Sequence, residues 1–195
     1  MVLKPENFTE QGQEVLASSQ EIVRRYNHSQ WDLEHILLAL LELDHGVPME
    51  VLKLLGVSTD LMKTDLEYTL SKEPKTTYDS SQIYVTPRAQ TFLENAKAEA
   101  DRFKDEFIGA EHMLIATIQE RNGDVPRIFQ SYGINQEKIY QALAEIRGGH
   151  RVTDPRAESR YQSLDKYSID LTKLARTGKL DPVIGREAEI KRVMQ

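Results

Sequence analysis

Two copies of one short motif carry the side chains best suited to chemistry in this chain. Glu34 and His35 are followed by Ile-Leu-Leu-Ala, and Glu111 and His112, which lie 77 residues later, by Met-Leu-Ile-Ala. Such histidines could bind a ligand or sense pH, because a histidine pKa lies near neutrality. We favour a simpler interpretation, in which each is a packed, hydrogen-bonded histidine that recurs because the segment is duplicated. The glutamates then occupy first helical turns, where a carboxylate opposes the positive end of the helix dipole.

The rest of the sequence offers no catalytic or metal-binding motif. The five histidines include neither an HExxH motif nor a pair spaced four residues apart, so no metal site is predicted. The absence of cysteine and of a Gly-x-Ser-x-Gly turn leaves no activated nucleophile. Gly178-Lys179 is followed by Leu180, and Lys173 stands where a Walker A loop needs its first glycine. We therefore predict no catalytic residue, no metal and no cofactor in this chain.

Charge and composition exclude two further classes of function. The formal net charge of −6 argues against nucleic-acid binding, which needs a basic surface. No apolar run is long enough for a transmembrane helix, and residues 1–6 do not begin a signal peptide. Together with the lack of cysteine, these features predict a cytoplasmic protein that binds neither nucleic acid nor membrane.

The duplicated motif lies within two long related segments, residues 8–70 and 85–147. Further identities at the same spacing link Thr9 with Thr86, Gln13 with Gln90, Leu16 with Leu93, Gly46 with Gly123 and Gly56 with Gly133. In the first copy the motif forms the stripe of an amphipathic helix, made by Leu33, Ile36, Leu37, Leu40 and Leu41. Because Leu38 and Ala39 widen this stripe, we expect a central helix that is buried on all sides.

Three more helices are expected in the first copy. Thr9 should cap the first of them, and Asp32 should cap the central helix, which we expect to end near residues 44–46 with Gly46 left-handed. A short helix should run from Pro48 to Gly56. The fourth should follow a cap at Ser58 or Thr59, and its expected apolar face consists of Leu61, Met62, Leu66 and Leu70.

The second copy repeats this order. Thr86-Pro87 should open a long helix, and further helices should start at Pro126 and span residues 135–147. The predicted fold is therefore all-α, a domain of residues 1–147 made of two four-helix repeats with pseudo-twofold symmetry. Residues 71–82 are predicted to link the halves, 148–160 to be a flexible tether, and 161–195 to form short helical segments.

At this level of detail the sequence resembles a known family, the Clp N-terminal domain. The Glu-His-apolar core of each copy resembles that domain, and residues 147–152 resemble its end in the ClpB branch. Residues 167–175 and 178–186 look like the opening of the first ATPase module of Clp-type AAA+ unfoldases. The resemblance implies that residues 161–195 are the truncated start of that module in a longer protein.

The resemblance also implies a function. Proteins of the ClpB type are homohexameric, ATP-driven disaggregases that work with a DnaK-type chaperone and thread aggregated polypeptide through a central pore. Their N-terminal domain helps to engage unfolded or aggregated chains. ATP and magnesium are accordingly expected in the full-length protein. This chain alone is expected to be a monomer without ATPase activity, because the hexamers assemble largely through ATPase modules.

By the same resemblance, Thr9, Asp105 and Glu111 correspond to polar positions implicated in substrate engagement. The apolar residues that flank them in sequence and could contact substrate are Phe8, Phe107 and Ile108. For the two phenylalanines, packing in the core is the alternative. Thr9 can serve as a helix cap as well, and Asp105-Glu106 could equally be a solvated turn.

Nucleotide contacts are implied for the full-length protein only. In the family the corresponding stretch lies against adenine, and here it comprises Asp181, Pro182, Val183, Ile184 and Gly185. In this chain by itself, Val183 and Ile184 are expected to be an apolar plug, because weak apolar contacts alone do not offset the entropy of binding.

Two other functions stay open. In the ClpC and ClpA branches a similar domain docks a folded adaptor or a modified degron, and that function predicts tight binding to one partner. A substrate-engaging domain predicts weak binding to many unfolded chains. An independent enzyme is a weaker alternative, since no nucleophile, metal or phosphate motif supports it.

Overall fold

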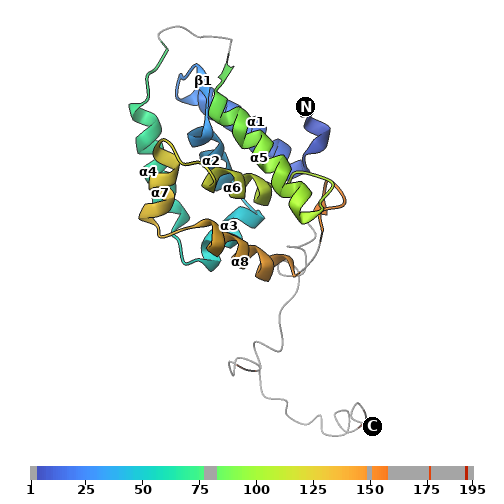
Figure 1. Cartoon of the computed structure of the whole chain (residues 1–195). Coiled ribbons are helices and arrows are strands. Elements are labelled where there is room, and N and C mark those ends of the chain that lie inside the picture. The colour runs from blue at the N-terminus through green and yellow to red at the C-terminus, as the bar shows by residue number, and fades with distance from the viewer. Residues whose placement is uncertain (1–3, 77–82, 149–150, 158–175, 177–191, 193–195) are drawn as a thin grey trace. The chain divides into compact units, whose positions relative to one another are not determined.

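The computed structural model describes residues 4–76, 83–148 and 151–157, together with Arg176 and Arg192. The chain divides into two compact units, residues 1–162 and 163–195. Every helix and strand named below belongs to the first unit (Figure 1). In the second unit only the two arginines are described, and both are exposed and helical.

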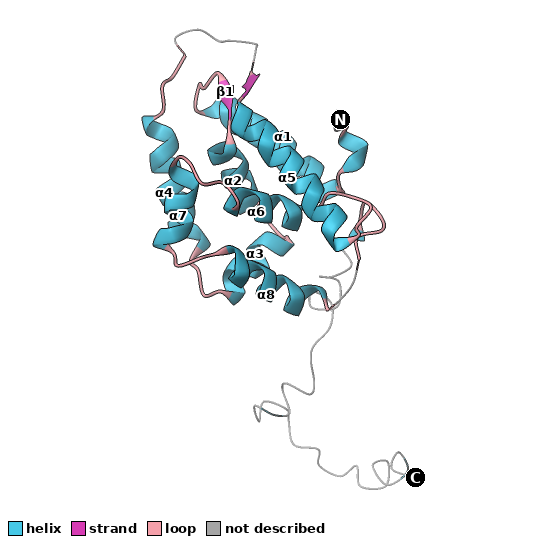
Figure 2. Cartoon of the chain, viewed as in Figure 1, coloured by secondary structure: helices cyan, strands magenta, loops and turns pink. Residues whose placement is uncertain are grey.

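Both halves of the first unit are mainly helical, which confirms the predicted all-α class (Figure 2). The first half contains a 3-10 helix η1 (Pro5–Asn7), α1 (Glu10–Arg25), β1 (Gln30–Trp31), α2 (Leu33–Glu42), α3 (Val47–Leu54) and α4 (Thr59–Lys72). The second half contains β2 (Tyr84–Val85), α5 (Pro87–Phe103), α6 (Ala110–Ile118), α7 (Asp124–Ser131) and α8 (Gln136–Arg147).

Local capping explains where the helices begin. The hydroxyl of Thr9 accepts a hydrogen bond from the Gly12 N–H, and the hydroxyl of Thr86 accepts the equivalent bond from Ala89. These bonds satisfy amide groups that have no partner inside the first helical turn. Further predicted caps are confirmed at Asp32 and Ser58, and Asn135, expected as the first residue of the last helix, is its N-cap.

The two central helices, α2 and α6, form the middle of the core. Every residue from Leu33 to Leu41 is buried, as is every residue from Ala110 to Thr117. Helix α2 packs against α1, α4 and α6, and α6 packs against α5, α7 and α8. Removing so much apolar surface from water is the main source of stability, and it holds the first turns of both central helices in place.

Two short parallel pairings connect the halves, and the sequence did not predict them. Trp31 pairs with Val85 in the β1–β2 ladder, and Phe8 pairs with Ile108 in an isolated bridge. The duplication relates Phe8 to Val85 and Trp31 to Ile108. Each half therefore lends the residue before its first helix to the segment that precedes the other half's central helix. This exchange is what the expected pseudo-twofold relation requires.

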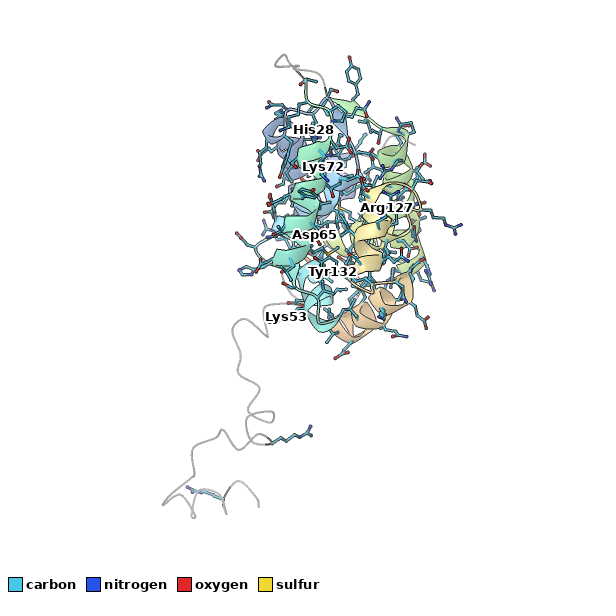
Figure 3. The ribbon with its side chains drawn as sticks, turned by 90° about the vertical axis from the view of Figure 1, so that its left-hand side faces the viewer. His28, Lys53, Asp65, Lys72, Arg127 and Tyr132 are labelled. Atoms are coloured by element: carbon cyan, nitrogen blue, oxygen red, sulfur yellow. The ribbon has the colours of Figure 1, made fainter. Side chains whose placement is uncertain are left out.

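A side-chain bond joins the halves on another face. The hydroxyl of Tyr132, which follows α7, donates to Asp65 Oδ2 on α4 at 2.7 Å. Figure 3 shows these two side chains next to each other between the two helices. The bond adds a polar link to the packing of α4 against α7.

Three local expectations are wrong. Gly46 is not left-handed: its φ of 171° is extended, and it serves as the N-cap of α3, whereas Gly56, with a φ of 73°, ends that helix in the left-handed conformation. Leu61 does not join the buried face of α4, because it is 61% exposed. Helix α7 begins at Asp124, before Pro126, since proline is tolerated throughout the first turn.

Residues 151–157 also differ from expectation, because they are docked on the domain and do not form a flexible tether. The main-chain amide of Val152 donates to Asp105 Oδ1, and the Glu10 amide donates to the Pro155 carbonyl. The side chains of Val152 and Ala157 are buried. Apolar burial and main-chain hydrogen bonds therefore fix a segment whose composition alone suggested mobility.

Replacing Gly12 with alanine is expected to lower the free energy of unfolding by about 1–3 kcal/mol, because the added methyl overpacks the site. A Cβ atom there would lie 2.8 Å from the Ile108 carbonyl oxygen and 3.3 Å from Phe8 Cβ. That carbonyl is fixed, since it accepts the Thr9 amide. Urea denaturation measures the effect, and the exposed Glu14→Ala in the same helix is the control. A Gly12→Ala protein as stable as the wild type would contradict this packing, since alanine ordinarily favours a helix over glycine.

Candidate functional site

The fold brings together candidate residues that lie far apart in sequence. The Thr9 amide donates to the Ile108 carbonyl at 3.0 Å, and the Ile108 amide donates to the Asn7 carbonyl at 2.8 Å. We call this place the junction: the N-terminus of α1, residues 104–109 and the first turn of α6. It contains all six substrate-binding candidates named from the sequence. Phe8 and Thr9 lie at the start of α1, Asp105, Phe107 and Ile108 in the loop, and Glu111 in the first turn of α6.

Most of these candidates are buried. Thr9, Phe8, Ile108 and Glu111 are almost inaccessible, and Asp105 is 6% exposed. Only Phe107 is partly exposed, and it is therefore the candidate most available to a ligand; the other five form the interior of the junction.

Each open alternative for these residues can now be placed. Phe8 belongs to the apolar core, so the core-packing alternative holds for it, and Ile108 is part of the same core. Thr9 acts as the expected helix cap. The idea of a solvated turn at Asp105-Glu106 is half wrong, because Glu106 is exposed while Asp105 is buried.

Asp105 is the centre of a buried charge network. Its Oδ2 accepts hydrogen bonds from His112 Nε2 at 3.0 Å and from Arg147 at 2.6 Å, and its Oδ1 accepts the Val152 amide at 2.8 Å. Burial by itself would raise the pKa of Asp105. The bonds from His112, the Val152 amide and Arg147 outweigh that effect and hold the pKa below its usual value. Asp105 is therefore a carboxylate in the folded domain.

The histidine in this network is fixed in one tautomer. The Gly109 amide donates to His112 Nδ1 at 2.9 Å, so Nδ1 must accept and the ring proton lies on Nε2. His112 Nε2 then donates to Asp105. The ring also caps α6 through its bond to Gly109. The prediction of a packed, hydrogen-bonded histidine is confirmed.

Glu111 is the least satisfied member of the network. It is fully buried, and neither carboxylate oxygen has a hydrogen-bond partner among the described residues. The nearest cation is Arg147, whose Nη1 lies 3.8 Å from Oε1. Arg147 therefore compensates two buried carboxylates at once. Sequence analysis did not single it out, because its equivalent in the first copy is Leu70.

The carboxylates and His112 also form a group that could in principle hold a metal ion. One potential ligand atom from each of Asp105, Glu111 and His112 lies within 4.8 Å of the others. However, His112 Nε2 carries a proton and Arg147 already supplies the positive charge. A metal ion would have to displace both. The chemistry of the donor set therefore fits an ion-pair network better than a metal centre.

The first half shows the same geometry with different residues. His35 Nε2 lies 2.8 Å from His28 Nδ1, and the Asp32 amide donates to His35 Nδ1 at 3.2 Å. His28 thus occupies the place of Asp105. Burial, followed by the neighbouring His28, lowers the pKa of His35 to about 4, so this pair is neutral near pH 7. His35 is packed and hydrogen-bonded, as predicted.

Glu34 differs from its counterpart Glu111 because it has a direct ionic partner. Arg88 on α5 donates to Glu34 Oε1 at 2.9 Å and lies 3.5 Å from both Asp32 and Glu120. Burial raises the pKa of Glu34, and Arg88 opposes that shift. This cluster ties α5 to the first turn of α2.

An apolar pocket opens beside the junction. It has a volume of about 470 Å³, and its lining combines apolar and aromatic side chains with arginines: Phe103, Tyr140, Leu143, Ala144, Arg102, Arg147 and Arg151. Since Arg147 belongs to both sites, the pocket is continuous with the charge network. Apolar pockets with a few polar groups are the usual form of a binding site.

Two further sequence predictions concern nucleotide binding and membrane insertion. The nucleotide-binding candidates, residues 181–185, lie outside the described part of the chain. Among the described residues, no helix combines the length and the apolar content needed to cross a membrane.

Comparison with known proteins agrees with this architecture. The Clp repeat (R) N-terminal domain family matches residues 7–152, which are thus an N-terminal domain and not an ATPase module. The chaperone protein ClpB 1 of Synechocystis sp. is 38% identical over 192 residues, which are 98% of this chain and 21% of that protein. The chain therefore spans about a fifth of that relative's length.

Solved structures show the same fold. The Hsp104 N-terminal domain from Candida albicans has a TM-score of 0.70 at 20% identity and covers 78% of this chain and 99% of its own. A complex of the ClpV N-domain with a VipB peptide has a TM-score of 0.61 at 17% identity, covering 76% and 94%. With its paired helical halves and residues 7–152 matched, the chain belongs to the Clp repeat N-terminal domain family.

Proposed function

We propose that this domain engages unfolded or aggregated polypeptide and passes it to an ATP-driven ring formed by the rest of a longer, ClpB-type protein. The observation that carries this proposal is the convergence of Thr9, Asp105 and Glu111 at one junction, next to an apolar pocket. The similar ClpV N-domain, whose complex contains a VipB peptide, supports peptide binding by this fold.

The wider role extends the same proposal. The ring is a homohexamer that uses ATP and magnesium, residues 181–185 contribute to its nucleotide site, and it works with a DnaK-type chaperone. The similarity to ClpB chaperones over nearly the whole chain supports this role. The domain itself contributes capture, and the apolar pocket beside the junction supports that role.

An amide NMR titration with a permanently unfolded, apolar polypeptide tests the function. We expect fast-exchange shifts that cluster at Glu106, Phe107 and the residues of the neighbouring pocket. Phe107→Ser should weaken binding several-fold, because Phe107 is the partly exposed aromatic residue of the junction. Leu61→Ser on α4 is the matched control, since Leu61 is also an exposed apolar residue.

Two results would contradict the proposal. Shifts spread evenly over exposed apolar residues, Leu61 included, would indicate non-specific contact. No shifts at millimolar polypeptide, with tight binding of one folded adaptor, would favour the adaptor-docking function of the ClpC and ClpA branches.

A further inference from the structure

Residues 151–157, which we call the strap, lie across the junction: residues 151–153 have no regular secondary structure, and a turn follows in which the Ala157 amide donates to the Asp154 carbonyl at 3.1 Å. Val152 is held on both sides of its main chain: its amide donates to Asp105 Oδ1 at 2.8 Å, and its carbonyl accepts the Glu106 amide at 2.9 Å. Farther along, the Pro155 carbonyl accepts the Glu10 amide at 2.9 Å. Two of these three bonds join main chain to main chain, which is a common way for a protein to hold a bound peptide.

Side chains of the strap add apolar and ionic contacts. Val152 is 0% exposed and Ala157 is nearly buried. Arg156 Nε donates to Glu10 Oε1 at 2.7 Å on the surface. The strap therefore presents a small aliphatic side chain to the interior and a basic side chain, four residues later, to Glu10.

The groups that hold the strap are those of the proposed substrate site. Asp105 is one of the candidates for substrate engagement, and Glu10 and Glu106 directly adjoin the candidates Thr9 and Phe107 in sequence. The Glu10 amide lies in the first turn of α1, where no helical carbonyl can accept it. A polypeptide can thus use these donors and Asp105 only when the strap does not.

We infer that the strap is an internal pseudosubstrate: it occupies the binding site for a polypeptide segment, and a substrate must displace it. This inference rests on the proposed function and specifies its ligand. The preferred segment has a small aliphatic residue at the Val152 position and a basic residue four positions later, with a turn between them. Proline is excluded at the first position, because it has no amide for Asp105.

The strap is the last continuous segment of the domain that the structure describes. Displacement of the strap by substrate would therefore release residues 151–157 from the junction. Substrate binding at the junction and release of the strap are then one event, since both use the same hydrogen-bonding groups.

A reversible disulfide tests the inference in the full 195-residue chain. Glu10→Cys combined with Arg156→Cys joins two side chains that are in contact, and the chain has no other cysteine. Binding of a labelled, permanently unfolded polypeptide is measured by fluorescence anisotropy before and after reduction. We expect the oxidised form to bind about tenfold more weakly than the reduced form, because the fraction of open site falls.

Release of the strap gives the opposite result. Val152→Ser removes the buried methyl groups but keeps the amide, and it should strengthen polypeptide binding severalfold relative to the wild type. Thr153→Ala is the control, since Thr153 is an exposed residue of the strap. The disulfide pair keeps the test decisive even where Val152→Ser lowers stability.

The outcomes separate the two proposals. Equal binding by the oxidised and reduced forms would overturn the pseudosubstrate and leave the proposed function intact. Weaker binding on release of the strap by Val152→Ser would also overturn it, since the strap would then be part of the site. No binding by any form would contradict the proposed function itself.

Discussion

Replacing Arg147 with leucine is expected to lower the free energy of unfolding by about 3–5 kcal/mol, the usual cost of leaving a buried charge without its partner. Arg147 is 4% exposed, donates to Asp105 at 2.6 Å and lies 3.8 Å from Glu111. Without the guanidinium, two carboxylates would remain in the interior, and Glu111 would lose its nearest cation. Urea denaturation at pH 7 measures the loss.

The chain itself supplies the rescue variant for this experiment. In the first half, His28 and Leu70 occupy the positions of Asp105 and Arg147, and His28 meets His35 at 2.8 Å. Asp105→His combined with Arg147→Leu should therefore recover part of the stability, because one uncompensated carboxylate is gone. Loss of less than about 1 kcal/mol in Arg147→Leu would show that the guanidinium does not stabilise the buried carboxylates.

The second large effect is a loss of stability between about pH 6.5 and pH 4. Burial and the neighbouring His28 lower the pKa of His35 from 6.5 to about 4 in the folded domain. In this interval the unfolded chain binds a proton that the folded domain does not, so stability rises with pH and falls on acidification. His35 accounts for about 3 kcal/mol by pH 4. Asp105, whose pKa is lowered, contributes a loss only below its unfolded value near 3.8.

His35→Gln isolates this effect. Glutamine at the third helical position can accept the Asp32 amide as His35 does, so the cap of α2 is kept while the titrating group is removed. The free energy of unfolding of the variant should depend less on pH between 4 and 6.5 than that of the wild type. His45→Gln, at an exposed histidine, is the control and should keep the wild-type slope. Equal slopes in all three proteins would contradict the assignment.

Short-range patterns in the sequence were sufficient for most of the fold. The stripe of Leu33, Ile36 and Leu37 predicted a buried central helix, and Thr9 and Thr86 predicted two helix starts. Both kinds of signal act within about one helical turn, where chain geometry fixes which groups meet. The duplication then implied the second half from the first, and the exchanged pairings of Phe8 with Ile108 and Trp31 with Val85 agree with it.

The substrate-site residues came from resemblance, and the sequence did not show their surroundings. The resemblance named Asp105 and Glu111. It did not name Arg147, which lies 42 positions from Asp105 and completes the buried charge network. The 77-residue offset aligns His28 with Asp105. However, the two side chains differ in chemistry, and the sequence did not show that they contact His35 and His112.

The tertiary structure alone decided the position of the strap. By composition residues 151–157 belong to a tether, because they contain few apolar side chains and a proline. Their order depends on one buried valine and on bonds to Asp105, Glu106 and Glu10, which are distant in the chain. Such contacts form only after the two halves have packed, because the folded core must first hold the partner groups in place. The sequence by itself therefore determined the helices and their duplication, whereas the folded core determined which charges are paired and what covers the junction.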